Sequence, residues 1–517
     1  MEDFESRYLA VASRDRRFEG RFLVAVTSTG VYCRVGCPSR TPRRDHVRFY
    51  LTPAAAEAAG FRACRRCRPE QADPPGDRLV RGALRLIAGG GVDGRGVDAA
   101  ARRLGVSTRT LHRRLTAAVG TSTLQIASSR RVQAARALIA ETRMPLTDVA
   151  FAAGFNSVRR FNEVVRDELG ASPSALREAA IREGEPPSDA GEPGPAAAGP
   201  GTAGAWLSLR LVTRQPFAAA PLLGFLAARA VSGVEAASAS GYARSVRAPR
   251  GAAVVDLTPD GPHVTLRVRL DDIRDLEDVV RRCRRLLDLD ADPVALTEAL
   301  GADALIGPLV AAAPGLRVPG SVDPFETAVR AVLGQQVSVA AARTLAGRLV
   351  GRLGDRLPLP SDSVTHLFPS PRRLAEADLD GLGLTGRRIE SIRALSRAVL
   401  EGDLDLAGGS PDAVEAALAR LPGFGPWTRA YIAMRGRGDP DAIPVSDLGL
   451  RRAMQRLGQP ADPASLAARA EAWRPWRAYA ALHLWNRLST PVTPPPGVGL
   501  DRASTLNPGE SPWPTTP

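Results

Sequence analysis

The chain has 517 residues, of which 69 are basic and 55 acidic, and its formal net charge is +14 with a pI of about 10.7. A chain this long and this basic is expected to contain several domains and to bind a polyanion such as nucleic acid. No apolar run is long enough to span a membrane and no signal-peptide pattern is present, so we expect a cytoplasmic protein and exclude an integral membrane protein.

Every basic residue is arginine, because the sequence contains no lysine. Arginine contacts phosphate through two N–H groups at once and stacks on bases, which suits a nucleic-acid partner. A GC-rich genome would also favour arginine codons. It would not explain the net excess of positive charge.

The first predicted domain, residues 1–73, contains four of the five cysteines. Cys33 and Cys37 form a C-x3-C pair, and Cys64 and Cys67 form a C-x2-C pair. Thiols stay reduced in the cytoplasm, so this spacing predicts one tetrahedral Zn²⁺ site. On spacing alone, a purely structural zinc is the more common outcome.

The residues around these cysteines resemble the zinc domain of the Ada family of adaptive-response regulators. The matching segments are Thr29-Gly30-Val31-Tyr32-Cys33-Arg34 and Ala59-Gly60-Phe61-Arg62. The resemblance implies that Cys33 takes a methyl group from a methylated DNA phosphate and keeps it. A methylated ligand would make the site less negative, which should raise its affinity for DNA. The Pro-Cys-His-Arg nucleophile that repairs alkylated guanine in that family is absent, so that activity is not predicted.

Residues 77–178 contain two related turn signatures, one at 97–115 and one at 146–161. Each places a glycine between two short amphipathic helices, which predicts tandem helix-turn-helix units with two recognition helices. The arrangement resembles the AraC-type DNA-binding domain, and it implies RNA polymerase as a further partner. The candidate DNA contacts are Arg109, Arg113, Arg159 and Arg160. A solvated helix face is the alternative for each of them.

Two segments are expected to lack regular structure: a flexible linker at 181–203, rich in Gly, Pro, Ala and Glu, and a disordered Pro-rich tail at 491–517. Residues 204–315 should form an α+β domain, because alternation in segments such as 264–270 predicts an antiparallel sheet covered by helices. Cys283 lies in an arginine-rich amphipathic helix and is expected to be a core thiol. The predicted fold class is multidomain α+β.

Several segments resemble the 3-methyladenine DNA glycosylase II family of helix-hairpin-helix enzymes. They are 223–231, 242–245, 319–326 and 333–340, and the resemblance runs from about 206 to 490. It implies an all-helical glycosylase domain at 316–490. Within it, the hairpin 421–428 turns backbone amides outward at a helix N-terminus, a geometry suited to gripping phosphate. Leu421, Gly423 and Gly425 are the predicted backbone contacts, and the resemblance implies a monovalent cation at this hairpin.

Asp447 follows the hairpin by about twenty positions and matches the catalytic aspartate of the family. It would stabilise an oxocarbenium-like sugar or activate the attacking water. Its alternative is an N-cap, since a helical pattern begins at Leu448. Trp427, Tyr431 and Trp485 match the aromatic residues of the pocket, whose faces favour cationic bases. Core packing is the alternative for each ring, and it is the expected role of Trp473, Trp476 and Tyr479.

Four positions affect the expected activity. Gln335 and Gln336, at the start of a predicted helix, fall where the family places its minor-groove and wedge contacts, and the family wedge is a leucine where this chain has Gln336. Leu448 replaces a family tyrosine, so affinity or substrate range should differ. Trp427 stands where related lyases use a lysine to form a Schiff base. Without any lysine, we expect base release without strand cleavage.

We therefore predict a monomeric alkylation-response protein that acts on alkylated double-stranded DNA and on promoter sites. It combines a methyl-phosphotriester-sensing transcription activator with a monofunctional glycosylase for bases such as 3-methyladenine. One alternative is a DNA-binding regulator whose glycosylase half is a weakly active lesion reader, motivated by Gln336 and Leu448. Another is an enzyme whose N-terminal half only raises DNA affinity.

Overall fold

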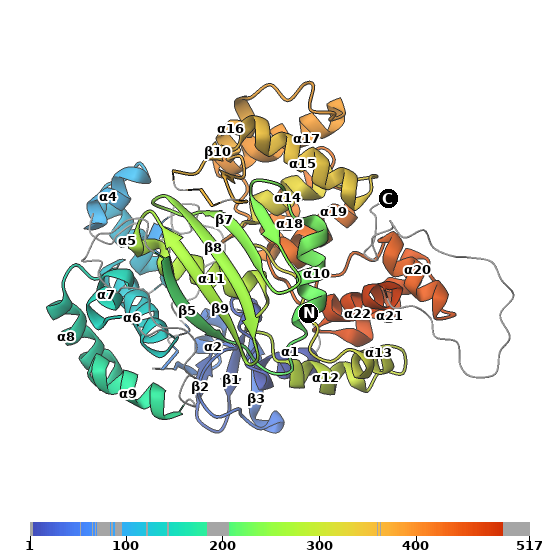
Figure 1. Cartoon of the computed structure of the whole chain (residues 1–517). Helices are drawn as coiled ribbons and strands as arrows, with labels where there is room; N and C mark the ends of the chain where they lie inside the picture. The colour runs from blue at the N-terminus through green and yellow to red at the C-terminus, as the bar shows by residue number, and fades with distance from the viewer. Residues whose placement is uncertain are drawn as a thin grey trace, which may run out of the picture.

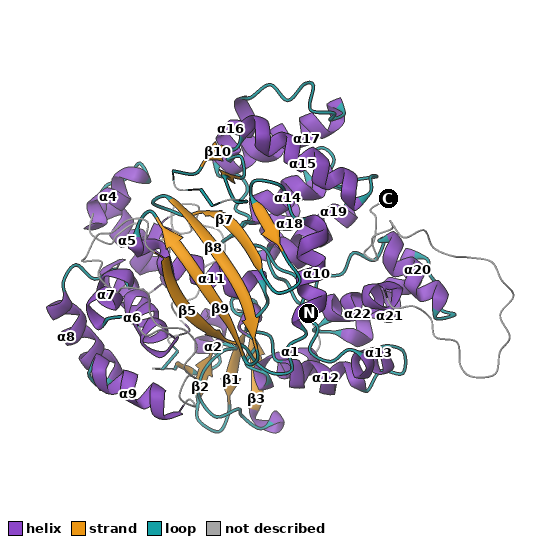
Figure 2. Ribbon diagram, viewed as in Figure 1, coloured by secondary structure: helices purple, strands orange, loops and turns teal. Residues whose placement is uncertain are grey.

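The computed structural model describes residues 4–183 and 206–489, apart from 52, 65, 68, 70–82, 84, 85, 88–95, 120–122, 142, 143, 359 and 362. Most of the expected linker and the whole of the expected tail at 491–517 lie outside the described residues. Helices surround a central antiparallel sheet, and a smaller sheet belongs to the N-terminal domain (Figures 1 and 2). Among the described residues, no helix is both long and apolar enough to cross a bilayer.

The N-terminal domain is built on a small four-stranded sheet in the order β3-β1-β2-β4. Its elements are α1 (Phe4–Ala12), the 3₁₀ turn η1 (Arg16–Phe18), β1 (Leu23–Val26), β2 (Val31–Cys33), the 3₁₀ turn η2 (Arg44–His46), β3 (Val47–Tyr50), α2 (Pro53–Ala58) and β4 (Arg62–Ala63). β2 pairs in parallel with β4, so Cys33 at the end of β2 comes close to Cys64, which follows β4. This pairing brings together two cysteines that are far apart in the sequence.

The second domain is helical and contains the predicted repeat. Its helices are α4 (Gly96–Arg103), α5 (Thr108–Val119), α6 (Thr123–Glu141), α7 (Leu146–Ala152), α8 (Val158–Leu169) and α9 (Pro173–Glu183). Gly105 and Gly154 lie in the turns of the α4–α5 and α7–α8 pairs with φ of +68° and +89°, a conformation that glycine adopts without steric cost. The tandem helix-turn-helix prediction is thus confirmed. α9 extends to Glu183, into the first residues of the expected linker.

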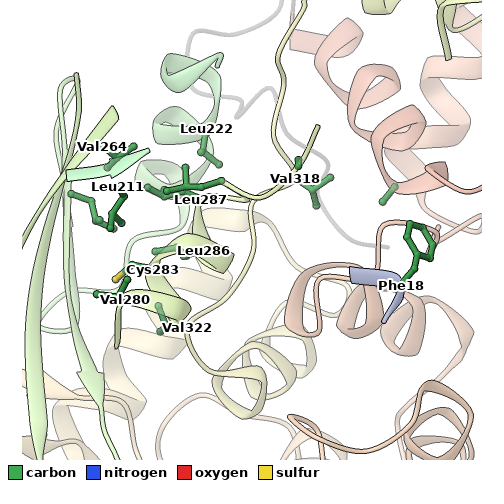
Figure 3. Close-up of a cluster of buried hydrophobic side chains, with 14 of the residues drawn as sticks. Phe18, Leu211, Leu222, Val264, Val280, Cys283, Leu286, Leu287, Val318 and Val322 are labelled. Atoms are coloured by element: carbon green, nitrogen blue, oxygen red, sulfur yellow. The ribbon is translucent and has the colours of Figure 1, made fainter. Parts of the chain in front are cut away.

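The central sheet has five antiparallel strands in the order β5-β9-β8-β7-β6. They are β5 (Trp206–Val212), β6 (Glu235–Ala237), β7 (Tyr242–Arg247), β8 (Ala252–Asp260) and β9 (His263–Leu270). Along β9, Val264, Leu266, Val268 and Leu270 are buried, as the alternating pattern predicts. α10 (Ala219–Arg229), the 3₁₀ turn η4 (Ile273–Asp275) and α11 (Leu276–Leu286) accompany the sheet. Cys283 on α11 is fully buried among apolar side chains, which confirms it as a core thiol (Figure 3).

The remaining elements form the helical part of the C-terminal half. They are α12 (Pro293–Gly301), α13 (Gly307–Ala312), α14 (Pro324–Leu333), α15 (Val339–Leu353), β10 (Asp355–Arg356), β11 (His366–Leu367), α16 (Pro371–Glu376), α17 (Gly386–Glu401), α18 (Pro411–Ala419), α19 (Pro426–Tyr431), the π-helix η5 (Ile432–Gly436), α20 (Leu448–Arg456), α21 (Pro463–Ala470), the 3₁₀ turn η6 (Glu471–Trp473) and α22 (Arg477–Ser489). Trp473, Trp476 and Tyr479 are buried in its core, as expected.

One cluster of buried apolar side chains continues from the N-terminal domain into the C-terminal half. It includes Phe18 and Phe22 near η1, Leu209 and Leu211 on β5, and Trp476 beside α22. A second cluster lies among α14, α15 and α17. The two halves of the chain therefore share a core.

Candidate functional site

Asp447 lies at the centre of the candidate site in the C-terminal half. Its side chain is buried, with 1% of the residue exposed, and it caps the N-terminus of α20 by accepting the Leu450 N–H at 3.0 Å. Trp427 donates its indole N–H to Oδ2 at 2.9 Å, and Trp485 donates its indole N–H to Oδ1 at 2.9 Å. The cap and the site residue, which the sequence offered as alternatives, are thus the same side chain.

Two of the predicted aromatic residues stack on each other. Trp427 and Tyr431 are one helical turn apart on α19, their ring centroids are 5.1 Å apart, and their planes differ by 16°. Both rings line a cavity together with Trp485 and Asp447. The structure therefore brings all four predicted pocket residues to one place.

Other residues that line this cavity come from α10, the sheet, α14 and η5. They include charged residues that the sequence reasoning did not single out: Arg229, Glu235, Arg244, Glu326, Arg330 and Arg435. The sequence contains a clue to two of these residues, because a charged residue interrupts an apolar helical segment. Arg229 does so in 223–231 and Glu326 in 324–333. Such positions are seldom buried unless they are paired.

Four of these charges form a buried network between the sheet and α14. Arg244 donates to Glu326 at 2.6 Å, and Arg330 donates to both Glu235 and Glu326 at 2.9 Å. Burial alone would raise the pKa of Glu235, but Arg330 and Arg244 outweigh it and lower that pKa below its ordinary value. The network holds the sheet and α14 together at the cavity while keeping each carboxylate paired.

Arg435 lies on the π-helix η5, directly after the stacked pair. Its guanidinium donates to the carbonyl of Pro319 at 2.7 Å, to the carbonyl of Gly320 at 3.2 Å and to the Tyr431 hydroxyl at 2.7 Å. Burial would raise the pKa of Tyr431, but the charges of Arg435 and Arg229 outweigh it and lower that pKa. Single-turn π-helices often occur at functional sites, and this one brings a cation to the cavity wall.

Gln335 and Gln336 occupy the turn between α14 and α15, not the start of a helix as expected, because α15 begins at Val339. The Gln335 amide donates to the carbonyl of Gly423 at 2.8 Å and to Oγ1 of Thr428 at 3.0 Å. Gln336 is exposed and has a φ of +55°, which is unusual for a residue with a side chain. Gln335 thus joins this turn to the hairpin, while Gln336 projects from it.

The hairpin lies between α18 and α19 and contains the predicted Leu421, Gly423 and Gly425. Gly423 has a φ of +81°, and a Cβ there would lie 2.2 Å from Oγ of Ser391. Gly425 caps α19 with a φ of −67°, and a Cβ there would meet no atom of the described residues within 4 Å. Leu421 is half-buried against the apolar cluster of α14, α15 and α17. Gly423 is therefore required by the fold of the hairpin, whereas Gly425 is not.

The four predicted metal ligands also come together. The Sγ atoms of Cys33, Cys37, Cys64 and Cys67 all lie within 4.8 Å of one another, and Cys67 is the most exposed of the four. The Arg34 N–H donates to Sγ of Cys67 at 3.4 Å. Four clustered thiols form a donor set that fits Zn²⁺, and they would hold one ion.

The four arginines predicted to contact DNA are exposed on the second helix of each helix-turn-helix unit. Arg109 and Arg113 lie on α5, and Arg159 and Arg160 lie on α8. The latter two pair with Glu163 at 3.1 and 3.4 Å. Exposed pairs of this kind are weak, so the arginines are available to exchange Glu163 for a phosphate.

The sequence matches four domain families along its length. Residues 6–70 match the metal binding domain of Ada, 100–179 a helix-turn-helix domain, 208–323 the AlkA N-terminal domain, and 329–478 the HhH-GPD superfamily of base excision DNA repair proteins. These matches follow the order of the described domains, and they include Asp447 and the four clustered cysteines.

Relatives resemble the whole chain or one of its halves. A Mycobacterium tuberculosis protein named "Probable bifunctional transcriptional activator/DNA repair enzyme AlkA" is 48% identical over 95% of this chain and 98% of its own length. The DNA-3-methyladenine glycosylase 2 of Escherichia coli is 42% identical over 51% of this chain and 92% of its own. The bifunctional transcriptional activator/DNA repair enzyme Ada of Escherichia coli is 41% identical over 16% of this chain and 24% of its own.

Proposed function

Since the chain belongs to the family of bifunctional transcriptional activator/DNA repair enzymes of the AlkA type, we propose how its two halves perform these tasks. The C-terminal half is a DNA glycosylase that removes alkylated bases such as 3-methyladenine, with Asp447 as its catalytic carboxylate. The observation that supports this role is the set of three N–H donors that fix Asp447 at the cavity. A residue that served only as a cap would not need two indole N–H groups to orient it.

The proposed reaction begins when the damaged nucleotide rotates out of the duplex, which costs a few kcal/mol. Gln336, exposed on its turn, fills the space that the base leaves, and the hairpin with Leu421, Gly423 and Gly425 holds the flanking phosphate. A monovalent cation, if bound, would be held by this hairpin and would supply positive charge beside that phosphate. The base enters the cavity beside Trp427, Tyr431 and Trp485. Because a purine alkylated at a ring nitrogen is already cationic, it leaves readily.

Asp447 then acts on the sugar. As the glycosidic bond breaks, its electron pair leaves with the base and positive charge develops on the sugar ring. The fixed carboxylate stabilises that charge or removes a proton from the attacking water. The water oxygen bonds to the sugar carbon, which leaves an abasic site. Trp427 occupies the position of the lyase lysine, so no Schiff base forms and the strand stays intact.

The N-terminal half is proposed to sense methylated DNA phosphates through Cys33. Its thiolate attacks the methyl carbon, the carbon–oxygen bond breaks, and the electron pair returns to the phosphate, which regains its charge. When bound, Zn²⁺ keeps the cysteines deprotonated at neutral pH. The methylated protein binds its promoter through the exposed arginines of α5 and α8 and recruits RNA polymerase.

The test of the glycosylase role is release of 3-methyladenine and 7-methylguanine from alkylated duplex DNA by the native protein and by Asp447→Asn. A matched control is Asp462→Asn, because Asp462 caps α21 in the same way, accepting the Ser465 N–H at 2.9 Å, but receives no indole N–H from the part of the chain that the structure describes. We expect activity in the native protein and the control, and none in Asp447→Asn. If no variant released base while all still bound the lesion, the lesion-reader alternative would hold.

The test of the sensor role is promoter binding before and after exposure to DNA that carries methyl phosphotriesters. We expect binding to increase after exposure and the increase to vanish in Cys33→Ala. An unchanged affinity in both proteins would support the alternative in which the N-terminal half only raises DNA affinity.

A further inference from the structure

A short segment of the N-terminal domain is buried against the C-terminal half. Within it, the Arg17 guanidinium donates to Asp15 at 2.6 Å and to Asp288 at 2.9 Å, and it also contacts the Tyr479 hydroxyl. The Arg17 guanidinium carbon lies 5.2 Å from the centroid of the Tyr479 ring. The Asp15 carboxylate accepts the indole N–H of Trp476 at 3.1 Å. Arg17 and Asp15 thus bond to residues more than 250 positions away.

This contact is a buried interface, unlike an ordinary surface ion pair. The Arg17 side chain is 16% exposed and that of Asp288 is 9% exposed. Phe18, the next residue, is fully buried in the shared apolar cluster (Figure 3). Arg21 pairs with Asp439 at 2.7 Å. Removing one member of a buried pair leaves the other charge without compensation, so the interface should be costly to break.

The same segment also packs against the loop between two of the cysteines. A Cβ on Gly36, which lies between Cys33 and Cys37, would come within 2.5 Å of both Cγ of Arg16 and Oε1 of Glu19. Arg14 donates to the carbonyl of Ser39 at 3.0 Å. A displacement of the cysteine loop would therefore displace residues 14–19 as well.

On the other side of the interface, the contact reaches the helix that supports the candidate catalytic residue. Tyr479 and Trp485 both belong to α22, and Trp485 is the residue that donates to Oδ1 of Asp447. Residues 14–21 thus lie between the loop of the metal ligands and the helix that orients Asp447.

We propose that the N-terminal domain docks against the glycosylase half and stabilises it, with Arg17 holding α22 in place. Through this contact, changes in the Cys33–Cys37 loop are transmitted to α22, the helix whose Trp485 orients Asp447. This inference goes beyond the proposed function, in which the two halves act separately. Arg17 is a positioning residue here, because it acts through Tyr479 and α22.

Hydrogen exchange of the α22 amides in the full-length chain tests the docking. Arg17→Ala should speed exchange across α22 by roughly tenfold or more, because a buried pair is lost and local opening becomes easier. Arg21→Ala, at the better-solvated edge of the same interface, should fold readily and speed the same amides by a smaller factor. Arg43→Ala is the matched control, since Arg43 is highly exposed and pairs only with nearby Asp45 within the described residues. The docking would be overturned if α22 exchanged in Arg21→Ala and Arg17→Ala as slowly as in the control.

Transmission from the metal loop is tested by Gly36→Ala, with zinc content measured in parallel. The added methyl group should displace Arg16 and Glu19, and α22 should exchange faster although one zinc ion per chain is retained. Faster exchange in the cysteine loop with unchanged exchange in α22 would overturn the transmission. Base release does not enter either test, so a failed glycosylase assignment would not be mistaken for a failed interface.

Discussion

The indole nitrogen of Trp485 lies 2.9 Å from Oδ1 of Asp447, although 38 positions separate the two residues in the sequence. α22 supplies the donor and the N-terminus of α20 supplies the acceptor. Trp427, on α19, donates to the other oxygen, Oδ2. The carboxylate is therefore positioned by three helices, α19, α20 and α22. This arrangement is compatible with the two roles of Asp447, as a helix cap and as the proposed catalytic carboxylate.

Replacing Trp485 by Phe should slow base release without unfolding the protein. The change keeps an aromatic face in the cavity but removes the donor to Asp447. A hydrogen bond to a charged group contributes about 1.5–3 kcal/mol, so we expect a decrease of roughly ten- to a hundredfold in the single-turnover rate. Trp206→Phe, a change at an exposed residue of β5, serves as the control. An unchanged rate in Trp485→Phe would show that the indole N–H has no part in orienting Asp447.

Gly423→Ala and Gly425→Ala should separate the two glycines of the hairpin. At Gly423 a methyl group would both clash with Ser391 and require a left-handed backbone, so DNA binding and folding stability should fall, the latter by about 1–3 kcal/mol. At Gly425 the methyl group meets nothing and φ is ordinary, so stability should hardly change. Denaturant unfolding and the affinity for an abasic duplex measure these effects. Equal losses in both variants would contradict the role assigned to Gly423.

The sequence predicted those features that depend on local residue spacing or on motifs that resemble known families. Three of these features each depend on residues that are close together in the sequence: the spacing within each cysteine pair, the turns at Gly105 and Gly154, and the alternation along 264–270. Their structures could therefore be predicted from local chemistry. The aromatic residues and Asp447 were found through the resemblance of their motifs. Their mutual hydrogen bonds depend on how α19, α20 and α22 pack.

The features that the sequence did not predict arise from contacts between distant segments. Arg17 lies 271 positions from its partner Asp288, and nothing near either residue signals the pairing. Likewise, Gln335 was expected at a helix start, but its amide bonds to Gly423 and so closes the turn before α15. Periodicity gives the face of a helix that is buried, but it does not identify the residue on the other side.

Gln336→Gly should slow base excision without lowering the free energy of unfolding. Glycine adopts the observed φ of +55° without strain, so the free energy of unfolding should stay equal or rise by up to about 1 kcal/mol. Without a side chain to fill the space left by the base, excision from a fully paired duplex should fall several-fold. Excision of a lesion placed opposite an abasic site should be nearly as fast as in the native protein, because less energy is needed to flip an unpaired base. Equal loss on both substrates would argue that Gln336 acts after flipping.

Metal removal should distinguish the clustered cysteines from Cys283. Chelation is expected to expose four thiols to a cysteine-labelling reagent and to lower the thermal stability of the N-terminal domain. Cys283 should stay unlabelled in the folded protein, because burial raises its pKa to about 12 and blocks access. Cys67→Ser should lower zinc content, and Cys283→Ser should retain one ion per chain. Loss of zinc in Cys283→Ser would contradict the assigned ligand set.

Acid should weaken the C-terminal half partly through His483 on α22. Burial lowers the pKa of His483 from 6.5 to about 4, despite a backbone hydrogen bond to Leu309 that raises it. Between these values the unfolded chain binds a proton that the folded chain does not, so stability falls as the pH decreases from about 6.5 towards 4. The loss from this residue is about 3 kcal/mol at most.

The contribution of His483 is measured as the difference between the native protein and His483→Gln in denaturant unfolding at several pH values. Carboxylates elsewhere also lose stability in acid, but their effect is common to both proteins and cancels in the difference. We expect His483→Gln to be less stable than the native protein at pH 7 and to approach it as the pH falls towards 4. His112→Gln, at an exposed position of α5, should follow the native protein throughout. A constant difference across this range would mean that His483 titrates alike in the folded and unfolded chains, which its burial against the core argues against.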